Sequence, residues 1–144
     1  MKYNHLGVYG IVIKDNKILL IKKVGGPYDG KLDLPGGTIE FGERPIETLK
    51  RELKEEVGID VKKYELLDCD SVSFDWEYNK EKVMVHHIGI FYKVIDYDND
   101  IKKEIEIDEK NDDSLGAEFY DINKLNKSEL SEIAILILNN INML

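Results

Sequence analysis

Strand-like patterns of hydrophobic residues recur along most of the chain. The stretch 5–13 is rich in β-branched and aromatic residues, and 17–22 repeats this composition after Asp15–Asn16. An Asp-Asn pair favours a tight turn, so these stretches predict a β-hairpin. Further strands are predicted at the following ranges, with a turn at 76–80 and an acidic loop at 108–113: 38–41, 63–74, 82–97, 101–107 and 118–122.

Two segments have the spacing of helices instead. In 45–57, four apolar residues fall within about 80° of arc at 100° per residue. Proline at the start and Gly58 after the end are favourable limits for this helix. A second helix is predicted from about 128 to 140. The order of strands, helix, strands and helix predicts an α+β fold, with helices packed on a mixed sheet.

Composition limits the partners that the protein can have. A chain of 144 residues suits one domain, spanning 1–144. The net charge of −9 disfavours binding to nucleic acid, because phosphates are normally met by surplus Lys and Arg. We expect no secretory signal and no membrane association, since no apolar run is long enough. The single Cys69 cannot form an internal disulfide, which favours a reducing, cytoplasmic location.

The first helix carries an acidic sector beside its apolar stripe, made of Glu52, Glu55 and Glu56. Like charges at these spacings cost about 0.2–0.5 kcal/mol per pair. Lys50 and Lys54 lie on another arc and do not neutralise them. One interpretation is a solvated acidic face. We favour a metal site, because hard cations prefer carboxylates together with backbone carbonyls, which the glycine loop just before the helix supplies.

Nine residues within this region stand at fixed spacings: Gly37, Glu43, Arg51, Glu52, Leu53, Glu55, Glu56, Gly58 and Ile59. The pattern G-x5-E-x7-R-E-U-x-E-E-x-G-U, with U aliphatic, resembles the signature of the Nudix hydrolases. The resemblance implies a Nudix-type α/β/α sandwich with a mixed β-sheet over the whole chain. It also implies hydrolysis of the pyrophosphate linkage in a nucleoside diphosphate joined to another group X, with Mg²⁺ or Mn²⁺ as cofactor.

The resemblance assigns metal ligands residue by residue. Glu52 and Glu56 match the core ligands, and Glu55 matches a third ligand or the base that activates water. Gly36 matches the position whose backbone carbonyl often completes the metal shell. A glutamate within hydrogen-bond reach of the attacking water can take its proton.

Other positions are assigned to support and substrate contact. Arg51 would orient a glutamate, and Glu43 would brace the loop onto the helix. Gly37 belongs to the glycine turn, where backbone can approach a ligand closely. The chain departs from many relatives in one respect, since Leu32 stands where they carry Trp.

The general base can also lie outside the signature in this family. Glu118 has the position that most resembles such an extra carboxylate, and Asp112 and Asp113 compete with it. The alternative for each is an ordinary exposed acid. The sequence therefore leaves the choice between Glu55 and these later acids open.

Aromatic residues are the candidates for holding a base. Trp76 and Tyr78 stand in the predicted polar turn, and Tyr28 stands in the glycine loop. Large rings at such places can stack on a base, or they can pack over the edge of the sheet. His86 and His87 point to opposite faces of one strand, so at most one of them faces a pocket.

The most direct hypothesis is a metal-dependent pyrophosphohydrolase acting on a small nucleotide, as a monomer or homodimer. A nucleoside triphosphate, including oxidised forms, is favoured because the chain is short, and a nucleotide sugar or ADP-ribose is the alternative. A catalytically silent Nudix-like module that binds a nucleotide is the competing hypothesis, although the complete signature disfavours it. A role in mRNA decapping is disfavoured by the −9 charge.

Overall fold

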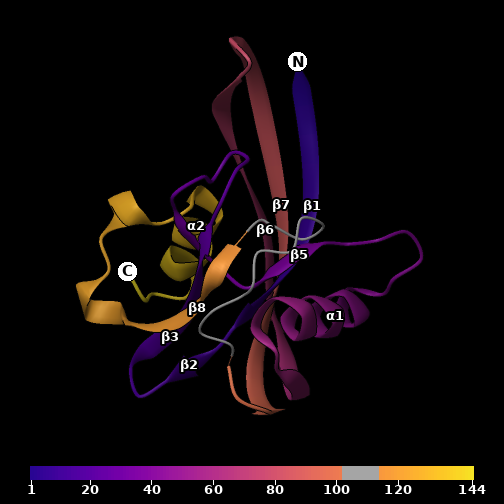
Figure 1. Cartoon of the computed structure of the whole chain (residues 1–144), viewed down its shortest axis with the longest axis vertical. Helices are drawn as coiled ribbons and strands as arrows, with labels where there is room; N and C mark the ends of the chain where they lie inside the picture. The colour runs from indigo at the N-terminus through magenta and orange to yellow at the C-terminus, as the bar shows by residue number, and fades with distance from the viewer. Residues whose placement is uncertain (102–113) are drawn as a thin grey trace.

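The structure is a computed structural model that describes residues 1–101 and 114–144 (Figure 1). Within these residues the strands are β1 (Lys2–Ile11), β2 (Ile13–Lys14), β3 (Lys17–Lys23), β4 (Leu32–Asp33), β5 (Gly36–Thr38), β6 (Asp60–Tyr78), β7 (Glu81–Asp98) and β8 (Ser114–Asp121). The helices are α1 (Pro45–Val57) and α2 (Glu132–Asn140), and short 3₁₀ turns span Ile122–Lys124 and Lys127–Glu129.

The strands form two sheets. The first is mixed, in the order β5-β1-β7-β6, with β1 parallel to β7 and the other pairs antiparallel. The second is antiparallel, with β3 at its centre between β2, β4 and β8. The chain passes from one sheet to the other at Val12, between β1 and β2.

The helices cover opposite sides of the sheets, as Figure 1 shows. Alternation along β3 explains the two layers of core. Leu19 and Ile21 pack in the cluster that contains the apolar face of α1, whereas Ile18 and Leu20 pack in the cluster that contains α2. Side chains of a strand alternate between its two faces, so one strand contributes to both cores. The predicted α+β fold, a mixed sheet sandwiched by helices, is confirmed.

Helix α1 has the limits that the sequence predicts. Proline occupies its first turn, and the backbone N–H of Arg44 donates to Glu47 Oε1 at 2.9 Å. Gly58 ends the helix with φ 81°, and its N–H donates to the carbonyl of Lys54 at 3.1 Å. A left-handed residue after the last turn is favourable for glycine.

The turns agree with the prediction at one place and differ at another. Asp15 and Asn16 have φ of 51° and 61°, which gives the predicted hairpin between β2 and β3. Residues 5–11 belong to the mixed sheet instead of to this hairpin. The predicted turn at 76–80 is wrong, because Trp76 and Tyr78 lie in β6 and only Asn79–Lys80 turns.

Helix α2 begins later than predicted, at Glu132. The hydroxyl of Ser131 accepts from the N–H of Ala134 at 3.2 Å and so caps the helix there. Most of the strand predicted at 101–107, and both Asp112 and Asp113, lie outside the described residues. No helix in the described residues is long and apolar enough to cross a membrane.

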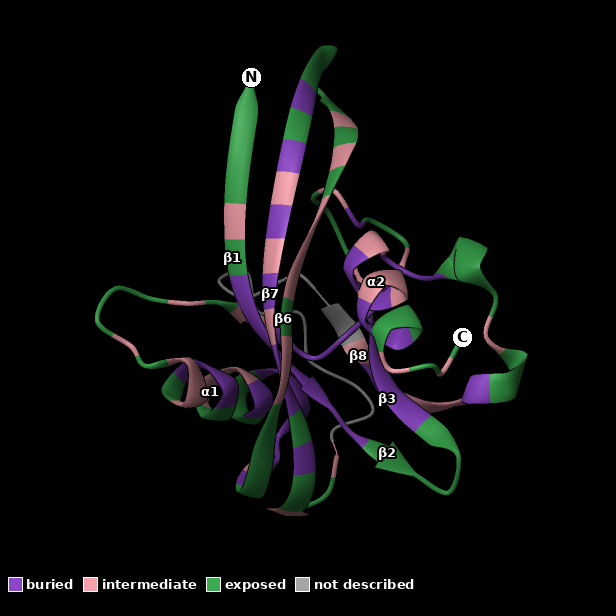
Figure 2. Cartoon of the chain, turned by 180° about the vertical axis from the view of Figure 1, so that it is seen from behind, coloured by how far each residue is buried: buried purple, intermediate pink, exposed green. Residues whose placement is uncertain are grey.

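The outer ends of β1, β6 and β7 extend beyond both helices (Figure 2). Exposed and buried residues alternate there along β7. The side of this extension that continues the α2 core forms one wall of the candidate site.

Candidate active site

Two glutamates of α1 converge on the glycine turn before the helix. Glu56 is only 7% exposed, and its Oε1 accepts the N–H of Gly36 at 2.9 Å. Glu52, one helical turn earlier, lies against Gly37, where an added Cβ would stand 2.6 Å from its carboxyl carbon. Residues four apart lie on one face of a helix, which explains why both acids meet the same turn.

Arg51 holds the acids of this region together. Its guanidinium donates to Glu43 at 2.8 and 3.0 Å, to Glu52 at 2.9 Å and to Glu55 at 3.3 Å. It also donates to the backbone carbonyl of Thr38 at 3.2 Å. These hydrogen bonds lower the pKa of Glu43 to about 2 and raise the pKa of Arg51. Arg51 therefore neutralises two acids of the sector, Glu52 and Glu55, whereas Glu56 meets the N–H of Gly36.

Glu43 also fixes the loop before the helix. Its Oε1 accepts the N–H of Glu40 at 2.9 Å and the hydroxyl of Thr48 at 3.0 Å. With the two bonds from Arg51, these contacts join the loop to two turns of α1. The family resemblance implies a bracing role for this position.

The donor set around the glycine turn fits a divalent cation of the Mg²⁺ type. Within the described residues, no three Asp, Glu, His or Cys side chains are already grouped around a metal-sized position. Arg51 holds Glu52, and the N–H of Gly36 holds Glu56, so each carboxylate is oriented within the protein. Mg²⁺ normally takes one or two carboxylates and completes its shell with water and substrate phosphates. Glu52, Glu56 and the Gly36 carbonyl supply donors of that kind.

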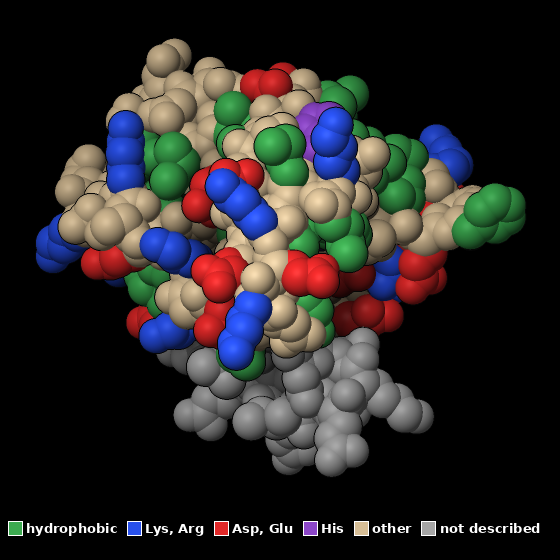
Figure 3. Space-filling model, turned by 90° about the horizontal axis from the view of Figure 1, so that it is seen from above, with side chains coloured by type: hydrophobic (Ala, Val, Ile, Leu, Met, Phe, Trp, Pro, Cys, Tyr) green, Lys and Arg blue, Asp and Glu red, His purple; other side chains and the backbone are tan. Residues whose placement is uncertain are grey.

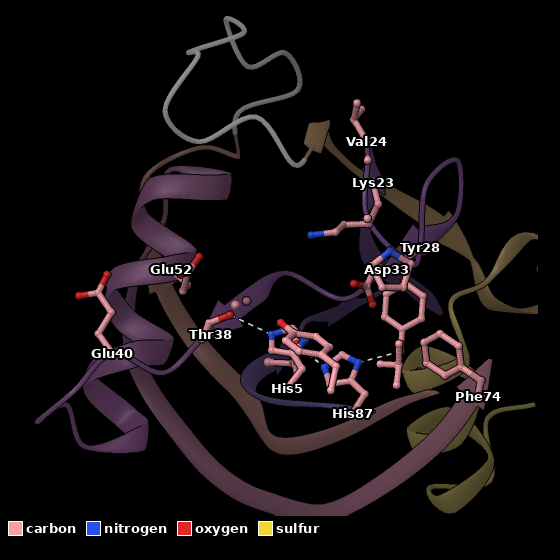
Figure 4. A pocket seen from close by; sticks show the side chains of 18 residues that line it. His5, Lys23, Val24, Tyr28, Asp33, Thr38, Glu40, Glu52, Phe74 and His87 are labelled. Atoms are coloured by element: carbon pink, nitrogen blue, oxygen red, sulfur yellow. Dashed lines mark hydrogen bonds between the residues drawn. The ribbon is translucent and has the colours of Figure 1, made fainter. Parts of the chain in front are cut away.

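A cavity of about 420 Å³ opens beside this turn (Figure 4). Acidic residues and the turn lie at one end: Gly36, Gly37, Thr38, Glu40 and Glu52. Asp33, Tyr28 and Phe74 lie at the other end, and Lys23 projects between the two ends. The cavity is therefore polar and acidic at one end and largely aromatic at the other.

The floor of the cavity is a buried histidine held by two tyrosines. Tyr9 OH lies 2.6 Å from His87 Nε2, and Tyr28 OH lies 2.7 Å from His87 Nδ1. Burial lowers the pKa of His87 to about 3, so its ring is neutral near pH 7. A neutral imidazole donates from one nitrogen and accepts at the other, so one tyrosine accepts and the other donates. Burial raises the pKa of Tyr9 and of Tyr28, which keeps both hydroxyls protonated.

A pair of glycines makes room for these rings. Gly7 of β1 lies opposite Gly89 of β7. A Cβ on Gly7 would stand 2.1 Å from Tyr9 Oη, and a Cβ on Gly89 would stand 2.4 Å from the ring of Phe91. The ring of Tyr9 therefore lies over Gly7, and the ring of Phe91 lies over Gly89. This position lets the hydroxyl of Tyr9 reach His87.

Asp33 is a functional candidate that the sequence prediction missed. Its side chain is only 3% exposed, and Oδ1 accepts the N–H of Leu34 at 2.8 Å and the hydroxyl of Ser131 at 2.7 Å. In the sequence, the one sign of this residue is an acid between two leucines. Its burial could not be predicted from its neighbours, because its hydrogen-bond partner Ser131 lies 98 positions away.

The structure places some of the predicted substrate residues at the cavity and others away from it. Tyr28 lines the cavity. Trp76 and Tyr78 do not line it: their rings pack on each other with centroids 5.0 Å apart, further out on β6. Glu118 lies exposed on β8 opposite Leu20 and borders a separate depression. Among the described residues, the cavity wall does not include Glu118.

Surface charge is mixed where it can be inspected. On the face seen in Figure 3, Lys and Arg side chains are interspersed with Asp and Glu. No continuous basic stripe crosses the described part of that face. The described part of this face therefore presents no continuous basic track of the kind that follows a nucleic-acid backbone.

Together these features define a class: an α/β/α protein in which glutamates of one helix meet a Pro-Gly-Gly turn beside a cavity. Residues 3–138 match the family model of the NUDIX domain. The chain therefore belongs to the Nudix hydrolase family.

Curated relatives match different lengths of the chain. An ADP-ribose pyrophosphatase of Methanocaldococcus jannaschii is 38% identical over 122 residues, covering 85% of this chain and 64% of that protein. An 8-oxo-dGTP diphosphatase of Buchnera aphidicola is 40% identical over 70 residues, covering 48% of this chain and 53% of that protein. The chain thus spans less than two thirds of the length of either relative.

Solved structures establish the fold. The MutT NUDIX hydrolase of Burkholderia pseudomallei superimposes with a TM-score of 0.74 at 24% identity, covering 94% of this chain and 96% of that one. The mutator MutT protein of Bacillus halodurans gives a TM-score of 0.63 at 25% identity, with coverage of 95% and 81%. The predicted Nudix-type α/β/α sandwich is confirmed.

Proposed function

We propose that this chain is a metal-dependent pyrophosphohydrolase that cleaves the pyrophosphate linkage of a nucleoside diphosphate joined to a group X. One observation carries the proposal: Glu52 and Glu56 converge on Gly36 and Gly37 at one end of a cavity large enough for a nucleotide. Small-molecule sites are typically cavities of this size with a few convergent polar groups.

The residues at the turn have separate roles. Glu52, Glu56 and the carbonyl of Gly36 would hold Mg²⁺ or Mn²⁺. The bound ion would lower the pKa of water and neutralise charge on the bridging oxygens. Arg51 keeps Glu52 in place through the 2.9 Å bond.

The base that takes the proton from the attacking water is assigned to Glu55. Its side chain is half-exposed on the same helix and is oriented by Arg51 at 3.3 Å. Glu118 remains the competing base. Neither acid lines the described cavity wall, and we favour Glu55 because it lies on α1 beside Glu52 and Glu56, whereas Glu118 lies on β8 at a separate depression. Glu55→Gln and Glu118→Gln separate the two, because only loss of the base should flatten the acidic limb of the pH–rate profile.

The polarity of the cavity supports a nucleotide substrate. A pyrophosphate would lie at the acidic end, near the residues that would hold the metal. Lys23 projects between the two ends of the cavity, where its ammonium group would lie near a phosphate. The aromatic end, with Tyr28 and Phe74, suits a planar base. The substrate is therefore proposed to be a free nucleotide and not a nucleic acid.

The curated relatives support two candidates for the group X that is joined to the nucleoside diphosphate. The ADP-ribose pyrophosphatase matches 85% of this chain, whereas the 8-oxo-dGTP diphosphatase matches 48%. ADP-ribose and oxidised nucleoside triphosphates are accordingly the first substrates to test, followed by nucleotide sugars.

The test is purified protein with Mg²⁺ and a panel of these nucleotides, with products identified by mass. Hydrolysis of at least one compound, abolished by Glu56→Gln, supports the proposal. Absence of any product across the panel, with nucleotide binding retained, would favour the silent binding module.

A further inference from the structure

Two aromatic side chains stand on either side of a small residue in one row of the mixed sheet. Tyr3 of β1 pairs with Val85 of β7, and Val85 pairs in turn with Phe74 of β6. Residues directly opposite each other in a sheet share one face, so these side chains form a row across the strands. All three line the cavity.

The centre of this row is open, whereas the next row is filled by rings. In the next row, His5 lies opposite His87, and their rings stack with centroids 4.4 Å apart and planes 15° apart. In the first row Val85 takes the central place and has no ring. Tyr3 and Phe74 rise from strands two spacings apart, which is about 9.6 Å. Two stacking contacts of about 3.5–4.0 Å need about 7–8 Å, so the space above Val85 has the width of one planar ring.

The rings on both sides of this space are held by neighbours. The ring of Phe74 stacks on that of Tyr28 with centroids 5.3 Å apart and planes 29° apart (Figure 4). The ring of Tyr3 stacks on that of His5 at 6.2 Å and 27°. Tyr3 nevertheless stays 47% exposed, and Phe74 is partly exposed. Each ring is therefore positioned within the protein and still accessible to a ligand.

The space above Val85 also lies at a suitable place for a nucleotide base. Thr38, at the acidic end of the cavity, pairs with Gly7 of β1. Gly7 is four residues along β1 from Tyr3, which corresponds to about 13 Å. A nucleotide lying along β1 would thus have its base beside Tyr3 and its phosphates towards the acidic end.

We propose that Tyr3 and Phe74 form an aromatic clamp that holds the base of the nucleotide between their rings, above Val85. Every base has a π face, so such a clamp recognises a planar heterocycle without selecting one base. Loss of one stacking ring costs about 5- to 150-fold in affinity. The inference rests on the proposed function, because it takes the cavity as the nucleotide site.

Binding of AMP and of ribose 5-phosphate, measured by calorimetry with Mg²⁺ present, tests the clamp without requiring hydrolysis. Both ligands carry the ribose and its phosphate, and only AMP carries a base. We expect the wild-type protein to bind AMP at least about 5-fold more tightly. Equal affinities within a factor of two, or no binding of AMP at millimolar concentration, would overturn the proposal.

Substitutions test the two rings themselves. Tyr3→Ala should weaken AMP binding at least about 5-fold and leave ribose 5-phosphate unchanged, whereas Tyr3→Phe keeps the ring and should stay within twofold of wild type. Phe74→Leu keeps an apolar side chain against the α2 core and should lose a similar factor.

Tyr78→Ala is the matched control. Tyr78 lies on β6 like Phe74 and is 55% exposed, but it does not line the cavity, so its loss should leave AMP affinity unchanged. A Tyr3→Ala protein that binds AMP within twofold of wild type would refute the clamp.

Kinetics separate failure of the clamp from failure of the proposed function. Tyr3→Ala should raise KM with little change in kcat, whereas Glu56→Gln should lower kcat. Base-dependent binding that requires Tyr3, in a protein that hydrolyses nothing, would refute the enzyme proposal and keep the clamp. Hydrolysis with a KM that Tyr3→Ala leaves unchanged would do the opposite.

Discussion

Alanine at Gly37 should damage the proposed metal site while leaving the fold intact. The new Cβ would lie 2.6 Å from the carboxyl carbon of Glu52 and 2.7 Å from both of its oxygens. An ordinary contact of about 3.4 Å requires the carboxylate to move by about 0.8 Å, which also strains its bond to Arg51. Misplacement by about 1 Å can cost about 100-fold in rate. We expect a turnover about 100-fold lower, together with a weaker dependence on Mg²⁺.

The neighbouring glycine supplies the control. Gly36 has φ 144°, and its Cβ would lie 2.1 Å from the backbone oxygen of Val8, so Gly36→Ala should cost about 2–5 kcal/mol of unfolding free energy. Gly37 does not have a positive φ, so Gly37→Ala should keep nearly the wild-type stability. Hydrolysis against Mg²⁺ concentration and urea unfolding measure the two effects. A Gly37→Ala protein with turnover within threefold of wild type would refute this account of the turn.

Three further substitutions test other parts of the site. Glu56→Gln should lower turnover at least about 100-fold with the fold kept, and near wild-type turnover would mean that Glu56 is not a ligand. Glu43, with its pKa lowered to about 2, stabilises the fold above pH 4.5 and loses that effect as the pH falls towards 2. Glu43→Gln should therefore be less stable at pH 7 in urea unfolding, and a difference that persisted at pH 2 would contradict this. His87 protonates in the unfolded chain near pH 6.5 but in the folded protein only near 3, so acid destabilises the fold by up to about 1.4 kcal/mol per pH unit between these values. His87→Gln should remove that part of the slope, measured between pH 7 and 5, and an unchanged slope would assign it elsewhere.

Local patterns in the sequence predicted α1 and its acids well. The helix limits depend on Pro45, Gly58 and the spacing of apolar residues, all of which act within a few positions. The convergence of Glu52 and Glu56 follows from the same helical spacing. Family resemblance then connected this helix to the glycine turn.

The aromatic end of the cavity was beyond local prediction. His5 meets His87 only because β1 pairs in parallel with β7, in a register that the sequence does not reveal. Asp33 similarly depends on Ser131 at the start of α2. Trp76 was predicted in a turn because its neighbours are polar. In the structure it lies in β6, where both faces of the projecting hairpin are partly exposed. Polar residues therefore alternate with aromatic residues along this part of the strand.

The contacts of Arg51 bear on whether the protein needs a metal ion in order to fold. Glu43, Glu52 and Glu55 all receive its donors, and Glu56 receives the N–H of Gly36. The carboxylates are thus neutralised or hydrogen-bonded by the chain's own groups. Folding should consequently not require a cation, and binding of the proposed metal should be a later, reversible step. A chelator should stop hydrolysis while the thermal midpoint of unfolding stays nearly constant.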